Sequence, residues 1–213
     1  MKNAMIVGAT GLVGNELLQL LVNDPLYDKI LLLLRRPLDF QHPSVEQRMI
    51  DFDQIETFQS DIRIDDVFCT LGTTIKTAGS QDAFRKVDFD YVVELGRWCK
   101  RNKVAQMLVV SAMGADPNSG IFYNRVKGEM EQALRNLDLP VTIFRPSLLM
   151  GNRKEHRSGE KMAQSVMGGL GFLFVGGLKK YKAIPASTVA KAMIRVAHEG
   201  TTGFKVLDSA QLW

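Results

Sequence analysis

The sequence predicts an α/β protein in which helices cover both faces of a doubly wound, mostly parallel sheet. Short apolar runs alternate with helix-length amphipathic segments along the chain. Several of these runs, such as Ile30–Leu34 and Met107–Val110, contain no polar residue, as expected for strands buried on both faces. The first run ends in spaced glycines that lead directly into a helix. Together these observations favour a parallel sheet between two layers of helices.

The predicted elements alternate along the whole chain, and we expect the sheet order 3-2-1-4-5-6-7. Most strand candidates are short aliphatic runs: Ala4–Val7, Lys29–Leu34, Gln47–Ile50, Asp66–Cys69, Gln106–Val110, Val141–Phe144 and Gly203–Leu207. The helix candidates lie between them, near Leu12–Val22, Asp82–Arg101, Phe122–Asn136 and Ser187–His198. Ser187 is a residue type that caps helices, so it could cap the last one. A chain of 213 residues suits one well-buried domain, and we expect a single domain over residues 1–213.

Composition narrows the class of protein further. With 46% hydrophobic and 23% charged residues, the chain resembles average soluble globular proteins, and its net charge of +4 is spread too thinly to indicate nucleic acid. The two cysteines and three histidines have no metal-ligand spacing, so we expect no metal site. The start MKNAMIVGATG leaves no room for a targeting segment, and Val166–Leu178 is too short to span a bilayer. These features predict a cytoplasmic protein without a membrane span.

The stretch Ile6–Gly14 carries the strongest functional signal. Its glycines are spaced G-x-x-G-x-x-G between a strand and a helix, which is the context that binding of a nucleotide diphosphate requires. Gly8 permits the tight turn, Gly11 lets the backbone approach the pyrophosphate, and Gly14 lets the helix pack closely on the strand. Free N–H groups at the start of the helix then receive the negative charge. The expected contacts are Gly8, Thr10, Gly11, Leu12, Val13 and Gly14.

The end of the second strand indicates which dinucleotide is bound. Sites for NAD place Asp or Glu there to bind the ribose hydroxyls, whereas this chain has Arg35 and Arg36. A guanidinium matches a 2′-phosphate, so we expect NADP(H) in preference to NAD(H), although the pair could also be a solvated strand end. Asp51 and Phe52 follow the third strand and are placed to meet the adenine; Asp51 could equally cap a turn.

A second group of residues predicts proton chemistry. Tyr123 and Lys127 are four residues apart, so a helix places them on one face. A cation beside a phenol favours the phenolate, which makes the tyrosine a usable proton donor. Ser111 closes the fifth strand, where its hydroxyl could hold a substrate carbonyl oxygen. An isolated Tyr–Lys pair is more often a surface feature, but here it accompanies a phosphate-binding turn and Ser111 on the same sheet edge.

These motifs resemble the short-chain dehydrogenase/reductase superfamily in its atypical branch, with a closer likeness to the Tat-interacting-protein-like oxidoreductases. The similar stretches span most of the chain: Ile6–Gly14, Leu34–Arg36, Asp51–Phe52, Cys69–Thr74, Val87–Val92, Tyr123–Glu129 and Phe144–Pro146. The resemblance implies a Rossmann-type sheet and cofactor contacts at Leu71, Gly72 and Pro146. It also implies that Lys127 binds the nicotinamide ribose.

Departures from that family restrict the expected function. Asp88 stands where many relatives carry an Asn that completes a proton relay; its carboxylate could relay protons or pair with Arg85 or a nearby cation. The chain also stops soon after its last strand, which argues against a nucleotide-sugar substrate. Specificity would then rest on residues 151–182, as a substrate-side insertion or lid. Cys69 is best interpreted as a small buried hydrophobe rather than a reactive thiol.

Two main hypotheses follow. The first is an NADPH-dependent reductase of a small carbonyl substrate of unknown identity, in which Tyr123 protonates the alkoxide, Ser111 orients the oxygen and Lys127 keeps Tyr123 competent. The second is a non-catalytic protein that senses NADP(H) and regulates a protein partner. A cofactor-retaining isomerase or dehydratase is a third possibility, and a homodimer is compatible with each.

Overall fold

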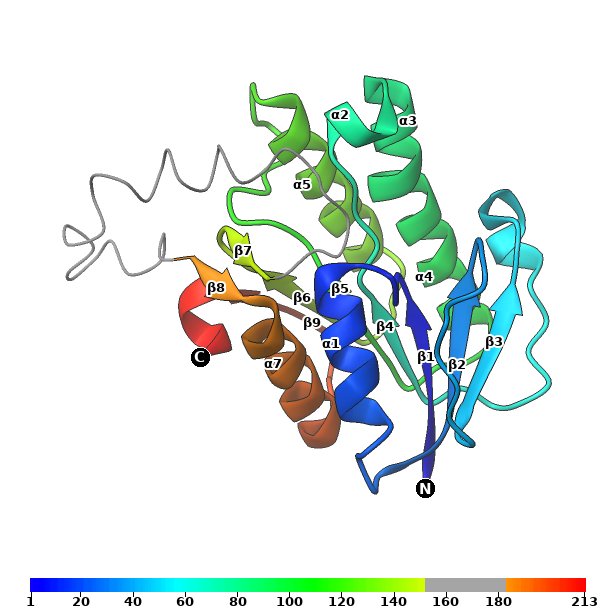
Figure 1. Cartoon of the computed structure of the whole chain (residues 1–213). Helices are drawn as coiled ribbons and strands as arrows, with labels where there is room; N and C mark the ends of the chain where they lie inside the picture. The colour runs from blue at the N-terminus through cyan, green and yellow to red at the C-terminus, as the bar shows by residue number, and fades with distance from the viewer. Residues whose placement is uncertain (152–182) are drawn as a thin grey trace.

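A seven-stranded parallel sheet forms the centre of the computed structural model, which describes residues 1–151 and 183–213 (Figure 1). Its strands are β1 (Lys2–Val7), β2 (Tyr27–Leu34), β3 (Val45–Met49), β4 (Asp66–Cys69), β5 (Gln106–Val110), β6 (Val141–Arg145) and β9 (Phe204–Asp208). The observed order is β3-β2-β1-β4-β5-β6-β9. Since β9 is the seventh strand of this sheet along the chain, the predicted order is confirmed. A substrate-side insertion or lid is expected over residues 151–182, and residues 152–182 of it lie outside the described residues.

Helices cover both faces of the sheet, as predicted (Figure 1). On one face, α1 (Leu12–Leu21) and α7 (Ala186–Glu199) pack beside each other over one apolar cluster. On the other face, α4 (Tyr91–Arg101) and α5 (Phe122–Arg135) cover a second cluster. The strands alternate between the two clusters, so that Ile6 faces the first and Val7 the second. The double burial explains why the central stretches of the sheet, such as Ile30–Leu34 and Met107–Val110, contain no polar residue.

Local structure departs from the sequence prediction in three places. The predicted helix Asp82–Arg101 consists of α3 (Gln81–Arg85), a π-helical turn (Lys86–Asp90) and α4. The predicted loop after β4 contains the short helix α2 (Ile75–Ala78). The suggested Ser187 cap is wrong, because α7 already starts at Ala186.

Smaller elements complete the described chain. They are two 3₁₀ helices, Phe52–Thr57 and Ser209–Leu212, and a two-stranded sheet of β7 (Leu149–Met150) and β8 (Ile184–Pro185).

Polar side chains join the strand starts at the amino-terminal edge of the sheet. Asp66, fully buried, accepts hydrogen bonds from the Tyr27 hydroxyl (2.6 Å), the Lys2 ammonium (3.1 Å) and the Gln106 amide (2.9 Å). These residues begin four neighbouring strands. A buried carboxylate is stable only when it is paired in this way, so the network fixes the strand register at this edge. The opposite, carboxyl-terminal edge is therefore the one left for a ligand.

In residues 1–151 and 183–213, no helix combines the length and apolarity needed to cross a bilayer. The same residues contain no grouping of three or more His, Cys, Asp or Glu side chains suited to a metal ion.

Candidate nucleotide-binding and catalytic site

The glycine turn lies where β1 passes into α1. Gly8 has φ +97°, a left-handed conformation that favours glycine, and a Cβ there would lie 2.7 Å from the Thr70 carbonyl carbon. A Cβ on Gly14 would overlap the Gly8 carbonyl oxygen, so α1 can approach the strand this closely only with glycine at that position. The backbone geometry therefore requires glycine at both positions, and the part of Gly8 and Gly14 in binding a nucleotide stays a prediction.

Thr70, directly after β4, holds this turn in place. Its hydroxyl is 3.0 Å from the Gly8 carbonyl oxygen and 3.2 Å from that of Val7. The Gly8 carbonyl also accepts the Gly11 N–H at 3.0 Å. The turn is thus tied to the neighbouring strand as well as to the start of α1.

The start of α1 fits a pyrophosphate. Gly11 is its N-cap, no side chain of the described residues caps it, and its first turn carries no acidic residue. The first N–H groups of a helix have no intrahelical partner, and the helix dipole favours an anion there. Thr10 is exposed and Leu12 is partly exposed beside this turn. The compact turn that Gly8 and Gly14 permit therefore leads into a helix start that suits the diphosphate of a dinucleotide.

The residues predicted to bind the adenosine half have different exposures. Arg35 and Arg36 are both exposed directly beyond the end of β2, where a 2′-phosphate could reach them. Asp51 is exposed, and its carboxylate accepts the Asp53 N–H at 3.0 Å, which is the turn-capping alternative. The Phe52 ring is 4% exposed and packs 5.6 Å from the Tyr91 ring, so it belongs to the core and only its backbone could face an adenine.

Helix α5 presents Tyr123 and Lys127 on one face, as predicted. Tyr123 is partly exposed and packs against the Phe84 ring, whereas the Lys127 side chain is 3% exposed. Asp88, on the π-helical turn, forms an ion pair with Lys127 (Nζ–Oδ1 2.7 Å) and accepts the Thr73 N–H at 2.9 Å. Of the alternatives for Asp88, pairing with a nearby cation is the one observed. π-Helical turns often occur at functional sites, and this one places Asp88 between the loop after β4 and α5.

Burial and charge act in opposite directions on this pair. Burial favours a lower pKa for Lys127, but the Asp88 carboxylate and the Tyr123 hydroxyl outweigh it, so the pKa of Lys127 is raised. The ammonium is therefore charged at neutral pH although almost no water reaches it. Burial also raises the pKa of the neighbouring Cys69 thiol to about 11. A thiol that stays protonated at neutral pH is a poor nucleophile, which agrees with the interpretation of Cys69 as a small buried hydrophobe.

The segment that follows β4 connects the glycine turn with the Tyr–Lys helix. Thr70 touches Gly8, and two residues later a Cβ on Gly72 would lie 3.5 Å from Asp88 Oδ1 and 3.9 Å from Lys127 Nζ. Gly72 is exposed and Leu71 is partly exposed, so both can face a ligand. The two predicted halves of the site therefore lie side by side at the carboxyl-terminal edge of the sheet.

Ser111 has a partner that the sequence analysis missed. Its hydroxyl donates to the buried Glu131 at 2.5 Å, and Glu131 also pairs with Arg145 at the end of β6 (Nη2–Oε2 2.6 Å). Glu131 follows Lys127 by four residues on α5, so helical spacing could have placed it on the same face. Its contacts with two other strands could not be read from spacing. Pro146, next to Arg145, is buried, and its carbonyl accepts the Met113 N–H at 3.0 Å.

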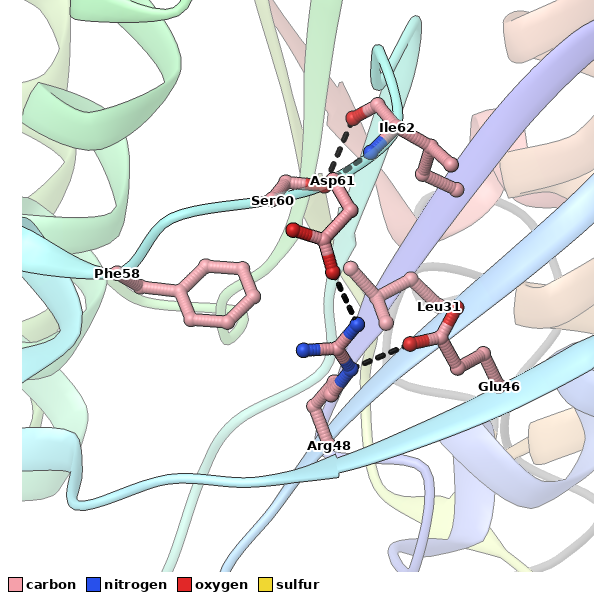
Figure 2. A pocket seen from close by; sticks show the side chains of 7 residues that line it. All are labelled: Leu31, Glu46, Arg48, Phe58, Ser60, Asp61 and Ile62. Carbon is pink, nitrogen blue, oxygen red and sulfur yellow. Dashed lines mark hydrogen bonds and ion pairs between the residues drawn. The ribbon is translucent and has the colours of Figure 1, made fainter.

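A hollow beside the edge strand β3 does not compete with this site. Figure 2 shows the Arg48 guanidinium between the carboxylates of Glu46 and Asp61, with which it forms ion pairs. Leu31, Phe58, Ser60 and Ile62 complete the lining, and the hollow has no room for a water molecule. Its charged groups already satisfy one another, so it offers a ligand neither space nor an unpaired charge.

The fold and the glycine turn define a dinucleotide-binding protein with a Rossmann-type sheet. The chain belongs to the NAD(P)H-binding family, which matches residues 8–199, and it is an atypical short-chain dehydrogenase/reductase protein. It is 34% identical to protein HTATIP2 of Rattus norvegicus over 198 residues, covering 91% of this chain and 80% of that protein. It is also 34% identical to the mitochondrial protein FMP52 of Coccidioides immitis over 208 residues, covering 91% and 85%.

Solved structures share the fold at much lower identity. MoeE5 in complex with UDP-glucuronic acid and NAD matches with a TM-score of 0.75 at 16% identity, covering 96% of this chain and 75% of that one. The Bordetella bronchiseptica enzyme WbmH in complex with NAD⁺ matches with a TM-score of 0.74 at 15% identity, covering 98% and 76%. At this identity the likeness extends to the fold and not to the substrate.

The comparisons correct one expectation. Relatives in Coccidioides immitis, Candida albicans and Emericella nidulans are named as mitochondrial proteins. The prediction of a cytoplasmic protein is therefore wrong. That prediction relied on the first residues of the chain, and the names of these relatives outweigh it.

Proposed function

We propose that this protein is an NADP(H)-dependent oxidoreductase that reduces a small carbonyl substrate. The observation that carries the proposal is the contact between the two halves of the site: the segment after β4 touches Gly8 at one end and the buried Lys127–Asp88 pair at the other. A dinucleotide whose diphosphate lies on α1 would reach the Tyr123 face of α5 along this segment. Membership of the NAD(P)H-binding family supports the same ligand.

In the proposed reaction the chain supplies binding, orientation and a proton. Bound NADPH would supply the hydride to the carbonyl carbon. The Tyr123 hydroxyl would donate its proton to the carbonyl oxygen as negative charge develops there. Lys127, held by Asp88, would keep a positive charge one helical turn from that hydroxyl and would bind the nicotinamide ribose. The contacts expected at Leu71, Gly72 and Pro146 would line the cofactor on the same sheet edge.

The preference for NADP(H) rests on Arg35 and Arg36. A hydrogen bond to a charged group contributes about 1.5–3 kcal/mol, so we expect Arg35→Ala or Arg36→Ala to weaken NADPH binding by about 10-fold or more. NADH lacks the 2′-phosphate, and its affinity should change much less. Isothermal titration with both coenzymes measures this, with Arg63→Ala as the matched control because Arg63 is exposed and pairs with Asp65. Equal losses for both coenzymes would contradict the assignment.

Turnover tests the role of Tyr123. Consumption of NADPH should be screened over a panel of small aldehydes and ketones, and Tyr123→Phe should lower any activity found by about 100-fold or more. The variant should still bind NADPH, because the phosphate turn is unchanged. Tyr91→Phe is the control, since that hydroxyl contacts Asp53 (2.9 Å) and lies on α4, away from the Tyr123 face of α5. Failure of the wild-type protein to bind either coenzyme would overturn the whole proposal.

The alternative is a regulator that binds NADP(H) and acts through a protein partner. One observation favours it: the Ser111 hydroxyl, expected to hold a substrate oxygen, donates to Glu131 instead. A regulator should bind NADPH, show no turnover with any carbonyl compound, and bind its partner differently in the NADP⁺ and NADPH forms. Reduction that depends on Tyr123 would exclude this alternative.

A further inference from the structure

The Ser111 hydroxyl has a fixed hydrogen-bond polarity in this structure, which means that its proton points in one direction. Glu131 is a carboxylate whose two oxygens accept hydrogen bonds from Arg145 (Nη2–Oε2 2.6 Å, Nε–Oε1 3.1 Å). Its Oε1 also lies 2.5 Å from Ser111 Oγ, and both side chains are buried. An ionised carboxylate can only accept, so the single hydroxyl proton of Ser111 must point toward Glu131. The lone pairs of Oγ are then the part of Ser111 left for any other group.

Arg145 donates hydrogen bonds to both oxygens of Glu131 and so orients its carboxylate. The hydrogen bonds that Arg145 donates to Glu131 raise the pKa of Arg145 despite partial burial, and Asp208 and Asp116 contribute in the same direction. The guanidinium is therefore a permanent positive charge against Glu131. Arg145 comes from the end of β6 and Glu131 from α5, so two independently anchored elements orient the carboxylate.

Ser111 lies at the ligand edge of the sheet. It directly follows β5, and its N–H donates to the Phe144 carbonyl at 2.8 Å. Glu131 lies one helical turn beyond Lys127 on α5, which connects Ser111 with the face that carries the Tyr–Lys pair. Ser111 is buried but retains 6% exposure at this edge.

We propose that Ser111 binds its ligand as a hydrogen-bond acceptor and that Glu131 is the positioning residue that imposes this polarity. The inference rests on the proposed function and changes the role first expected for Ser111. A carbonyl oxygen would meet only lone pairs at Oγ, so its polarisation falls to Tyr123. The group that Ser111 recognises must carry an N–H or O–H, and two sources have that chemistry: the nicotinamide carboxamide and the hydroxyl of an alcohol.

The first test needs no ligand. Ser111→Cys places a thiol beside Glu131, and thiolate absorbance near 240 nm, taken as a difference from wild type, reports its ionisation. A neighbouring carboxylate disfavours the thiolate, so adding Glu131→Gln should lower the pKa of the introduced thiol by about one unit or more. The same titration curve in both backgrounds would overturn the polarity argument. This outcome is independent of whether the protein binds any nucleotide.

The second test identifies the source of the donor. Binding of NADP⁺ is compared with binding of its 3-acetylpyridine analogue, in which a methyl ketone replaces the carboxamide and removes the N–H donor. A second pair of ligands tests a substrate hydroxyl. Cyclohexanol, which carries an O–H donor, is bound to the NADPH form of the protein, and cyclohexanone, which carries none, is bound to the NADP⁺ form, so that neither complex can react. Loss of one hydrogen bond corresponds to about 5-fold in affinity. Ser111→Ala should therefore weaken binding of the donor-bearing member of one pair by about 5-fold and spare its ketone counterpart.

The outcomes separate the two proposals. A loss confined to NADP⁺ identifies the carboxamide as the donor, and a loss confined to cyclohexanol identifies a substrate hydroxyl. Equal losses within a pair, a larger loss for the ketone member, or no loss at all would overturn the acceptor role. Thr142→Val is the matched control, because it removes a buried hydroxyl that pairs with Thr201 at 2.8 Å, near the opposite end of β6. Absence of nucleotide binding in the wild-type protein would overturn the proposed function, and the thiol titration would still test the polarity of Ser111.

Discussion

Removing the charge of Asp88 should destabilise the protein more than any surface carboxylate can. Asp88→Asn keeps the side-chain shape and an oxygen for the Thr73 N–H, so the variant loses the charge and the acceptor oxygen that face Lys127. The Lys127 side chain is 3% exposed, and water cannot replace that partner. Breaking a buried ion pair from one side costs about 3–5 kcal/mol. We expect about 3 kcal/mol, because Lys127 can release its proton, and this is a large share of the roughly 5–15 kcal/mol that stabilises a typical domain.

A double-mutant cycle measured by urea unfolding at pH 7 checks this value. The cycle combines Asp88→Asn with Lys127→Met, and the double variant should be more stable than Asp88→Asn alone because no unpaired charge remains. Asp61→Asn is the control: it breaks an exposed ion pair with Arg48 and should cost less than about 1 kcal/mol. The reasoning would be refuted if the losses in free energy of unfolding of the two single variants added up to the loss in the double variant. It would also be refuted if Asp88→Asn lost no more than the Asp61→Asn control.

The stabilisation that the Lys127–Asp88 ion pair gives to the folded protein depends on pH in a direction that follows from the pKa of Lys127. The pKa of Lys127 is raised in the folded protein, so the stabilisation is fully present below the unfolded value of about 10.4. It is lost only as the pH rises through the higher folded value. The free energy of unfolding of the wild type, relative to that of the double variant, should therefore be the same at pH 7 and at pH 8.5.

Three further outcomes follow from the geometry. Gly14→Ala should abolish NADPH binding in isothermal titration and lower the melting temperature, because its Cβ overlaps the Gly8 carbonyl oxygen; unaltered binding would contradict the close packing. Cys69 and Cys99 should not react with a thiol reagent at pH 8 until urea is added, since burial raises both pKa values; rapid labelling of the native protein would show otherwise. Tyr27→Phe should cost about 1–3 kcal/mol in urea unfolding by removing a buried hydrogen bond to a carboxylate, and a measurable change in NADPH affinity would contradict its remoteness from the site.

The parts of the structure that local chemistry determines were predictable from the sequence. Gly8 and Gly14 could be assigned their roles because a strand, a glycine spacing and a helix start are adjacent in the chain. Tyr123 and Lys127 could be paired because helical spacing alone puts them on one face. The strand order was predictable because a doubly wound sheet has few alternatives.

Contacts between segments that are far apart in the sequence could not be predicted in this way. Nothing local marks Thr70 as the residue that holds the glycine turn, because its contact with Gly8 arises from strand pairing. Glu131 could have been placed on the Lys127 face, but its bond to Ser111 depends on the register of α5 against β5. Phe52 was assigned to the adenine from its place after a strand, and its burial against Tyr91 depends on how the following 3₁₀ helix packs.

The hydroxyl of Thr70 and the N–H of Gly11 both reach the Gly8 carbonyl, so two hydrogen bonds hold the loop that we propose receives the diphosphate before any nucleotide arrives. A preorganised receptor loses little conformational entropy on association, and no slow ordering step precedes docking. Nucleotide capture should accordingly follow a single exponential whose rate rises linearly with coenzyme concentration. In Thr70→Ala the loop would gain freedom, and the same traces should acquire a slower second phase.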